Sequence, residues 1–448
     1  MIDVVIPNNF IEERKYIIET LLTTFLGLNV NIVSDSTTSD YLITLPNAKQ
    51  ITIKDDFFSK FITDEGYLHT RNIPKEVQFG KNRFLSEENI PILYGSENIT
   101  IEPSAIACNI DIFASSFFML SRWEEYVTSE KDEHARFPDT LSLAYKFNFH
   151  KRPIVNEYTE MLWNMMSFLD NSLKRKEQKY TVSITHDVDN FRRYDTLKKY
   201  IKALAGDIIN RKNPLLCFST TNDYIQYKLG LKKDPHDTFD FLMDISEKHN
   251  LKSHFYFMPN ILGETDAKYD IRDSLVKKTI DTIVKRGHII GIHGSYDGFN
   301  QTEIFENDIK RIRNISPNIN KGRQHYLRFE NPTTWQLWED YKLKYDSTIG
   351  FSHFAGFRSG TCYSYPVFNV LSRKKLKLQE EPLIAMEGAV QKEYPKLSDF
   401  IDEIITLANI TKKYNGKFVF LWHSNTINVT EWKDYSAQYE QIISSIVC

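Results

Sequence analysis

Three short polar segments of the sequence could bring carboxylates and imidazoles together. Asp187 and Asp189 stand two residues apart in THDVD, and a cation or a shared proton would relieve the repulsion between them. His293 and Asp297 are four residues apart in HGSYD, so both can reach one ion if the segment turns helical. His423 ends the apolar run KFVFLW and is a candidate proton donor.

Each segment also has a structural explanation when it is taken alone. The aspartates of THDVD could cap a turn or a helix, and HGSYD has the composition of an exposed turn. A single histidine after an apolar strand is more often a hydrogen-bonded core residue. All three segments, however, directly follow apolar runs that we predict as strands. This coincidence favours one common site over three unrelated turns.

The elements that must position these residues alternate regularly after residue 180. Repeated strand–helix–strand units imply parallel strands with right-handed crossovers, and about 270 residues of them predict a (β/α) barrel. In such a barrel, polar residues that follow the strands gather at one rim. The seven expected strands are Val182–Thr185, His254–Met258, Ile289–His293, His325–Phe329, Leu343–Asp346, Lys377–Met386 and Lys417–His423.

The residues before this pattern predict a separate unit. Residues 1–175 have the mixed character of a smaller α/β domain, with strand-like pieces at Asp40–Leu45 and Gln50–Ile53. The charged stretch NSLKRKEQKY, residues 171–180, is the expected boundary, so the second domain would span residues 176–448. No motif in the first domain indicates a chemistry.

Composition narrows the function classes. The 448 residues are 41% hydrophobic and 13% aromatic, enough for full-sized cores. The net charge is −3 with both signs scattered, which gives no support for nucleic-acid binding. The N-terminus does not have the pattern of a secretory signal, and the longest apolar run, Ile110–Leu120, is shorter than the ~20 residues that span a bilayer. We therefore expect a cytoplasmic protein that does not span the membrane.

The cysteines give no metal-binding pattern. The four of them are widely separated and form no CxxC pair. Any metal ion would have to be held by histidines and carboxylates. The sequence carries no signal for an oligomeric state.

In this order, the polar segments resemble the motifs of the polysaccharide deacetylase superfamily, the family 4 carbohydrate esterases with a NodB-type domain. THDVD is similar to the first motif, T-F-D-D, which implies Asp187 as general base and Asp189 as metal ligand. HGSYD is similar to the second motif, H-[ST]-x-x-H, which implies His293 as a ligand, with Asp297 standing where the second histidine should be.

Three later segments continue the resemblance. RQHY is similar to the motif R-P-P-Y, which implies that Arg323 orients the base and that the amide of Tyr326 helps to bind the oxyanion. Asp346 in YDST matches the acidic residue that steers the catalytic histidine, and LWH matches the motif whose histidine, here His423, is the general acid. The resemblance covers residues 180–448 and implies a distorted (β/α)7 barrel of NodB type.

A closer resemblance is to a bacterial subgroup found with surface-polysaccharide genes, in which an N-terminal domain of unknown function precedes the barrel. It is carried by IDIFASSFFMLSRWEEY, RQHYLRF, YDSTIGF, GFRSGTCYSYPVF and LWHSN. It implies a metal-dependent hydrolase that removes an N-acetyl or other acyl group from an amino sugar or glycan precursor. Because no export signal is evident, the substrate would be a nucleotide- or lipid-linked sugar or oligosaccharide. Zinc is the expected cofactor, with cobalt, manganese and nickel as alternatives.

A second hypothesis follows from the replaced histidine: a catalytically silent relative that binds a glycan. Two further residues are candidates for substrate contact. Trp422, next to His423, could stack on a sugar ring. Arg358 in GFRSG could bind an anionic substrate group. Both also have structural explanations, because most tryptophans lie in cores and a loop arginine is more often structural.

Overall fold

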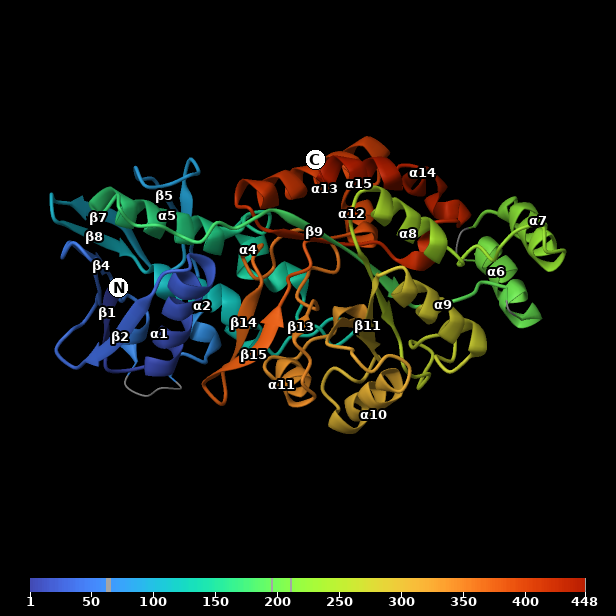
Figure 1. The fold of residues 1–448 in the computed structure, drawn as a ribbon, viewed down its shortest axis with the longest axis horizontal. Coiled ribbons are helices and arrows are strands. Elements are labelled where there is room, and N and C mark those ends of the chain that lie inside the picture. Colours follow the sequence, from blue (N-terminus) through green and yellow to red (C-terminus); the bar gives the residue numbers. More distant parts are fainter. Residues whose placement is uncertain (62–65, 195, 210–211, 448) are drawn as a thin grey trace. The chain divides into compact units, whose positions relative to one another are not determined.

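The computed structural model of the chain consists of two compact units (Figure 1). The described residues are 1–61, 66–194, 196–209 and 212–447. The first unit comprises residues 1–181, 326–384 and 410–418, and the second comprises 182–325, 385–409 and 419–448. The sequence predicts two continuous domains that meet after residue 175, whereas each compact unit consists of separate segments of the chain. Residues 326–384 and 410–418, expected within the second domain, therefore belong to the first unit.

The first unit contains a mixed sheet with the strand order β2-β1-β3-β4-β8-β7. Its strands are β1 (Ile2–Pro7), β2 (Val30–Asp35), β3 (Tyr41–Thr44), β4 (Gln50–Ile53), β7 (Gly95–Ile101) and β8 (Ala105–Ile110). In β3, Tyr41 and Ile43 are buried, whereas the alternate residues Leu42 and Thr44 are partly exposed. This alternation is typical of a sheet with one face on a core. The strands expected at Asp40–Leu45 and Gln50–Ile53 are confirmed by β3 and β4.

The other elements of the first unit come from distant parts of the chain. They are the helices α1 (Ile11–Ile18), α2 (Ile112–Ser121), α3 (Trp123–Val127), α4 (Leu143–Lys146), α5 (Ile154–Leu169) and α11 (Thr333–Asp340), and the strands β5 (Gln78–Gly80), β6 (Ile90–Ile92), β13 (Tyr345–Asp346), β14 (Tyr365–Asn369) and β15 (Lys374–Glu380). Helix α2 is buried along its whole length. It begins after Asp111, whose carboxylate accepts a hydrogen bond from the amide of Ala114 and so satisfies a free N–H of the first turn.

The second unit is built on a largely parallel sheet with the order β12-β11-β10-β9-β17-β16. Its strands are β9 (Thr181–Val188), β10 (Ser253–Phe257), β11 (Ile289–Gly294), β12 (Lys321–Gln324), β16 (Ala385–Met386) and β17 (Lys417–Leu421). The pairs β9–β10, β10–β11, β11–β12 and β16–β17 are all parallel. Every residue of β10 is buried, as expected for a parallel strand covered on both faces.

Helices follow most of these strands. They are α6 (Leu197–Ile209), α7 (Leu216–Lys228), α8 (Phe239–Lys248), α9 (Ser274–Lys285), α10 (Thr302–Arg313), α12 (Glu387–Glu393), α13 (Leu397–Lys413), α14 (Lys433–Ser436) and α15 (Tyr439–Val447). In α9, Val276, Ile280 and Ile283 form one buried stripe. Gly287, two residues beyond this helix, has a φ of 81°, which allows the tight turn into β11. Among the described helices, none combines the length and apolar character that crossing a bilayer requires.

The strand expected at His325–Phe329 is wrong. Strand β12 lies earlier, at Lys321–Gln324, and the backbone then turns, with Tyr326 and Leu327 both at positive φ (57° and 54°). The apolar residues of HYLRF suggested the later position, whereas the pairing strand is the polar KGRQ. His325 is therefore the first residue after the strand. The strand order is that of a mixed α/β fold with a parallel-rich sheet, and a closed barrel of seven strands stays a prediction.

Candidate active site

Strand β9 directs the two predicted carboxylates to one side. Side chains alternate along a strand, so Asp187 and Asp189 share a side and His186 lies on the other. The His186 Nδ1 donates to the main-chain oxygen of Trp422 at 2.7 Å, and burial lowers the pKa of this imidazole to about 4. His186 is therefore a neutral structural residue. The valine between the two aspartates is fully buried, which leaves both carboxylates on the side of the site.

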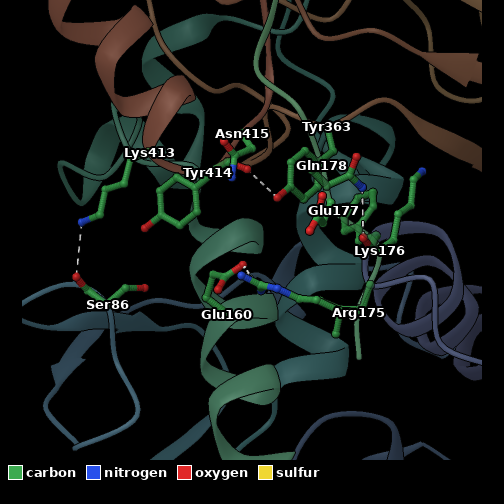
Figure 2. A pocket seen from close by; sticks show the side chains of 12 residues that line it. Ser86, Glu160, Arg175, Lys176, Glu177, Gln178, Tyr363, Lys413, Tyr414 and Asn415 are labelled. Carbon is green, nitrogen blue, oxygen red and sulfur yellow. Dashed lines mark hydrogen bonds and ion pairs between the residues drawn. The ribbon is translucent and has the colours of Figure 1, made fainter. Parts of the chain in front are cut away.

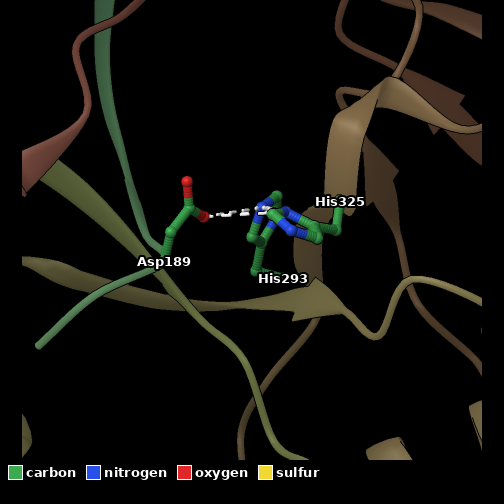
Figure 3. Close-up of side chains that lie close together, drawn as sticks. All are labelled: Asp189, His293 and His325. Carbon is green, nitrogen blue, oxygen red and sulfur yellow. Dashed lines mark hydrogen bonds and ion pairs between the residues drawn. The ribbon is translucent and has the colours of Figure 1, made fainter. Parts of the chain in front are cut away.

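Asp189, His293 and His325 form a cluster of potential metal ligands (Figure 3). One atom from each of the three side chains lies within 4.8 Å of the corresponding atoms of the others. Asp189 Oδ1 is 3.3 Å from His293 Nε2 and 3.6 Å from His325 Nδ1. The three residues come from the carboxyl ends of β9, β11 and β12, three strands that the parallel pairing brings together at one edge.

Main-chain carbonyls fix which ring nitrogen of each histidine faces the cluster. His293 Nδ1 donates to the carbonyl of Arg323 at 3.0 Å, and His325 Nε2 donates to the carbonyl of Thr265 at 2.8 Å. In the neutral rings, the remaining nitrogens carry lone pairs, and these two atoms face each other at 2.9 Å. Two lone pairs at this distance repel unless a proton or a metal ion lies between them.

The charge of the cluster fits a divalent cation. Asp189 Oδ1 is buried and accepts no hydrogen bond from the described residues. Burial lowers the pKa of His325 to about 4, so this imidazole is neutral and able to bind a metal at neutral pH. Although burial opposes it, the negative charges of Asp187 and Asp189 raise the pKa of His293. Two imidazoles and one carboxylate are ligands that zinc accepts in catalytic sites.

Asp297 does not belong to this cluster, so the expected ligand set is corrected at this position. The residues after β11 form turns over 296–300 rather than the helix that the spacing of four residues required. Asp308 holds the start of this segment, because its carboxylate accepts hydrogen bonds from the amide and the hydroxyl of Ser295 at 2.8 and 2.7 Å. The second imidazole comes instead from His325. The sequence signal for it was the histidine inside RQHY.

Asp187 lies beside the cluster and is held by Arg323. Arg323 Nη1 donates to Asp187 Oδ1 at 3.0 Å and to the hydroxyl of Thr185 at 3.1 Å. The other carboxylate oxygen of Asp187 is 3.7 Å from His293 Nε2. Arg323 is fully buried and Asp187 is nearly so. The guanidinium therefore fixes the orientation of the carboxylate, as the predicted pairing of these two residues requires.

His423 reaches the site from the end of β17. Its Nε2 is 3.7 Å from Asp189 Oδ2, and its Nδ1 donates to Glu387 Oε1 at 2.7 Å. The main-chain N–H of His423 donates to the same oxygen at 3.1 Å. Although burial alone would lower it, the charge of Glu387, together with Asp189 and Asp187, raises the pKa of His423 to about 10. This imidazole is therefore protonated at neutral pH and can act as an acid.

The carboxylate that holds His423 is thus Glu387, not Asp346. Glu387 follows β16, the strand that pairs directly with β17, so it stands beside the end of that strand. Asp346 belongs to the first unit, where its carboxylate accepts hydrogen bonds from the hydroxyl and the amide of Thr348 at 2.5 and 3.1 Å. The family motifs do not predict Glu387, because it lies in EGAV, outside the segments that resemble them.

The two predicted substrate contacts are corrected by their burial. The Trp422 ring is fully buried among aromatic side chains, including Tyr439 at 5.1 Å and Phe400 at 6.0 Å, so neither face is available to a sugar. Arg358 is only 2% exposed and binds Glu125 through two hydrogen bonds of 2.9 and 2.7 Å. It is a structural arginine of the first unit.

Tyr326 follows His325 directly. Its side chain is 40% exposed and its backbone has a φ of 57°, a conformation that turns the chain sharply after the cluster. The main-chain oxygen of Tyr326 accepts a hydrogen bond from Arg136 at 2.8 Å within the first unit. The role expected for the Tyr326 amide stays a prediction.

The first unit has a separate cavity of about 320 Å³ (Figure 2). Two of its basic residues are paired: Arg175 contacts Glu160 of the lining at 2.6 Å, and Lys413 contacts Glu87 outside the lining at 2.5 Å. The described residues that line it include no histidine or cysteine. This cavity therefore offers no ligand set comparable with that of Asp189, His293 and His325.

Sequence comparison bears on the N-terminal part of the chain. A family described as "Family of unknown function (DUF7033)" matches residues 2–171. This range covers nearly all of the domain expected at residues 1–175. Among curated proteins, no match to the chain is found.

Three solved structures with distant similarity were identified. A proposed polysaccharide deacetylase from Mycobacterium smegmatis has 14% identity and a TM-score of 0.38, over 61% of this chain and 85% of that one. A proposed polysaccharide deacetylase involved in O-antigen biosynthesis, from Bordetella bronchiseptica, has 10% identity and a TM-score of 0.28, over 60% and 84%. The chitin deacetylase of the fungal pathogen Colletotrichum lindemuthianum has 11% identity and a TM-score of 0.30, over 60% and 82%.

Proposed function

We propose that this protein is a metal-dependent hydrolase that removes an N-acetyl or other acyl group from an amino sugar or glycan precursor. The observation that carries the proposal is the cluster of Asp189, His293 and His325, in which one ring nitrogen of each imidazole and a carboxylate oxygen face one another. Zinc suits this ligand set, with cobalt, manganese or nickel as alternatives. Three protein ligands leave a further coordination position open, as catalysis requires.

When bound, the divalent ion supplies Lewis-acid polarisation of the acyl carbonyl and makes a water easier to deprotonate. The chain's own residues supply the proton transfers. Asp187, oriented by Arg323, takes the proton of the attacking water. The amide of Tyr326 donates to the oxyanion, an interaction typically worth about 3–4 kcal/mol.

His423 delivers a proton to the departing amine. Its Nδ1 is held by Glu387, so its Nε2 points toward the Asp189 carboxylate and the space beside the cluster. A protonated imidazole in this position lets the amine leave as a neutral group. The products are the free acid, such as acetate, and the amino sugar.

The second imidazole of the cluster argues against the alternative hypothesis of a catalytically silent glycan-binding protein. That hypothesis arose because Asp297 replaces a histidine of the motif. His325 supplies the missing imidazole, so the geometry supports the enzymatic function. The substrate in this proposal is an acetylated amino sugar on a nucleotide or lipid carrier, which an enzyme of the cytoplasm would meet during surface-polysaccharide assembly.

Metal analysis tests the ligand assignment. Protein purified without chelator should contain close to one equivalent of zinc, cobalt, manganese or nickel, measured by plasma mass spectrometry. The double variant Asp189→Ala with His293→Ala should contain none, because two of three ligands are lost. Retention of the ion in the double variant would overturn the assignment.

Acetate release tests the reaction. UDP-N-acetylglucosamine and N-acetylated oligosaccharides serve as substrates, and acetate is measured enzymatically. The Asp187→Asn variant should keep its metal ion and lose activity by about 10²–10⁴-fold, because its amide cannot accept the proton. Undiminished acetate release by this variant would show that another group is the base.

A further inference from the structure

Helices α6 and α7 of the second unit, and the residues that directly follow α7, carry large apolar side chains that remain exposed. We call six of them the hairpin surface, and their exposed fractions range from 56% to 77%. They are Leu197, Ile201, Ile209, Phe218, Leu229 and Leu231. In Figure 1, α6 and α7 stand apart from α8 and α9 of the same unit. Isolated exposed leucines are common, but a group of this size on two adjacent helices and the turn after them indicates an interaction surface.

The inner side of the same hairpin is polar and aromatic. Tyr200 of α6 stacks on Tyr224 of α7 at 4.0 Å between ring centres. The carboxylate of Asp207 accepts a hydrogen bond from the Thr220 hydroxyl at 2.7 Å, and both groups are buried. Tyrosines and a buried acid thus join the helices, while isoleucines and leucines face outward. This is the reverse of the pattern expected for a helix pair surrounded by water.

The hairpin surface lies in a strongly basic part of the chain. Residues 192–233 contain ten Lys or Arg and three Asp, a net charge of +7, whereas the whole chain carries −3. Lys198 and Lys202 directly follow Leu197 and Ile201 along α6, and so they border the apolar stripe. Exposed aliphatic residues flanked by lysines are typical of helices that lie at the interface of an anionic membrane.

A basic cleft continues from α6 to the strand ends of the candidate active site. Its volume is about 850 Å³, and its lining includes Arg192, Arg193, Lys199, Lys202 and Lys268, with one acidic residue, Glu431. Asn190 and Asn425 also line it. These two residues follow Asp189 by one position and His423 by two, so the cleft lies next to both.

We propose that the hairpin surface docks on an anionic lipid bilayer. Its apolar side chains would enter the headgroup region, and the neighbouring lysines would contact lipid phosphates. The positive charge argues against a second copy of the chain as the occupant, because a two-fold contact would place the two basic regions against each other. If the proposed function holds, the basic cleft would receive the phosphate of a lipid-linked sugar while the enzyme is docked.

Vesicle co-sedimentation with the full chain tests the docking. The wild-type protein should bind vesicles of phosphatidylglycerol and phosphatidylcholine, bind pure phosphatidylcholine less, and bind more weakly as salt increases. The triple variant Ile209→Ser, Phe218→Ser, Leu229→Ser should bind at least about tenfold more weakly, because serine cannot enter the interface favourably. The charge variant Lys198→Glu with Lys202→Glu should lose binding to the anionic vesicles specifically.

Matched substitutions on another helix of the same unit serve as controls. Val284 of α9 is 52% exposed and Lys278 of α9 is exposed, so Val284→Ser and Lys278→Glu change the same properties elsewhere. Both should bind vesicles as the wild type does. Circular dichroism and metal content should be unchanged in every variant, which shows that the second unit is folded.

Four results would overturn the proposal. The first two are failure of the wild type to bind anionic vesicles, and vesicle binding by the triple variant that equals that of the wild type. The third is complete displacement of the protein from vesicles by inorganic pyrophosphate, which would indicate phosphate capture alone. The fourth is a wild-type dimer that the triple substitution converts to monomers. The experiment uses no sugar substrate and can be done with metal-free protein. Vesicle binding can therefore be established even if the deacylation proposal fails. Deacylation can likewise be established even if the protein does not bind vesicles.

Discussion

Two main-chain carbonyls decide the chemistry of the candidate metal centre. Because the carbonyls of Arg323 and Thr265 each accept a ring N–H, the other ring nitrogens of His293 and His325 are fixed toward Asp189. Such partners around a metal site orient the ligands before the ion binds and raise their basicity. The ligand role of His325 thus depends on the turn of the backbone after β12 as much as on the histidine itself.

Substitution of His325 distinguishes the observed cluster from the set expected by motif. His325→Ala should lower metal affinity by more than about 100-fold, because a direct ligand contributes more than the 10–100-fold of an outer partner. Asp297→Ala should leave affinity unchanged, since the turn at residues 296–300 keeps this residue out of the cluster. Competition with a chromophoric chelator measures both. The opposite ranking of the two variants would restore Asp297 as the ligand.

The partner of His423 can be tested through its titration. In metal-free protein, Glu387→Gln removes the charge that raises the pKa of His423, so this pKa should fall from about 10 toward the usual value near 6.5. The imidazolium that persists above pH 7 in the wild type would then deprotonate below neutrality. NMR of the histidine ring signals measures the shift. Activity at pH 7 should fall by about 10²-fold or more, because the acid form is depleted.

The Asp346→Asn variant is the control for Glu387→Gln. Asp346→Asn leaves the Glu387 contact intact and should not move the His423 titration. A shift in the Asp346 variant together with none in the Glu387 variant would support the motif-based assignment instead.

At the scale of single residues, the sequence predicted those side chains that directly follow apolar strands. Three contacts of 3.3–3.7 Å connect Asp187 to His293, His293 to Asp189, and Asp189 to His423. The rule that polar residues follow the strand ends predicts all four. Glu387 could not be found in this way, because its role depends on the pairing of β16 with β17. The sequence also does not show that the Trp422 side chain is buried, and the prediction of a sugar contact there is therefore wrong.

The elements of the site depend on close packing between β11 and β12. Gly322 of β12 lies directly against Ile292 of β11, and a Cβ atom at this glycine would lie 1.9 Å from the Ile292 carbonyl oxygen. A backbone atom cannot move aside as a flexible side chain can. The absence of a side chain at residue 322 therefore keeps His293 and His325 at their observed separation.

Gly322→Ala tests this dependence. The substitution should destabilise the second unit by about 3 kcal/mol and weaken metal binding, because the strands must separate. Gly388→Ala is the matched control, since no atom lies within 4 Å of the position of its Cβ. Thermal unfolding and metal titration report both effects. Equal melting temperatures for the two variants would show that β11 and β12 tolerate the added atom.

The same packing explains why the hydrophobic pattern predicts the wrong position for strand β12. Periodicity favours runs of apolar residues, and KGRQ has none, whereas HYLRF has three. Glycine at residue 322 and the buried, paired guanidinium of Arg323 make the polar run suitable for a strand. Neither property is visible to a pattern of hydrophobicity. Strands β10 and β17 contain the apolar or aromatic runs FYF and FVFL, which the hydrophobic pattern does predict.

At the scale of the molecule, the first unit is assembled from distant segments. Tyr16 donates to the carbonyl of Pro366 at 2.8 Å, and the amide of Val155 donates to the carbonyl of Gly360 at 2.8 Å. The buried pair of Arg358 and Glu125 adds a charged connection of 2.7 Å. Local composition located the exposed linker at 171–180, but it could not reveal that residues beyond it return to complete the first unit.

This discontinuity predicts the behaviour of a divided chain. A fragment of residues 1–175 lacks Arg358 and leaves Glu125, Tyr16 and Phe117 without partners from the later segments. Glu125 keeps its contact with Arg122 at 2.8 Å, but the rings of Tyr16 and Phe117 lose the Phe368 ring that packs on them. Exposing a large apolar side chain costs about 1.5–3 kcal/mol, a substantial part of the stability of one domain. The fragment alone should therefore show no sharp thermal transition and should bind a hydrophobic dye.

Co-expression with residues 176–448 should restore a stable complex that purifies as one species, because the break falls in an exposed segment and cuts no helix or strand. Differential scanning calorimetry of the fragment, the complex and the intact chain compares the three. A cooperative transition of the fragment alone, at the temperature of the intact chain, would show that residues 1–175 form an independent domain and that the later segments merely pack against it.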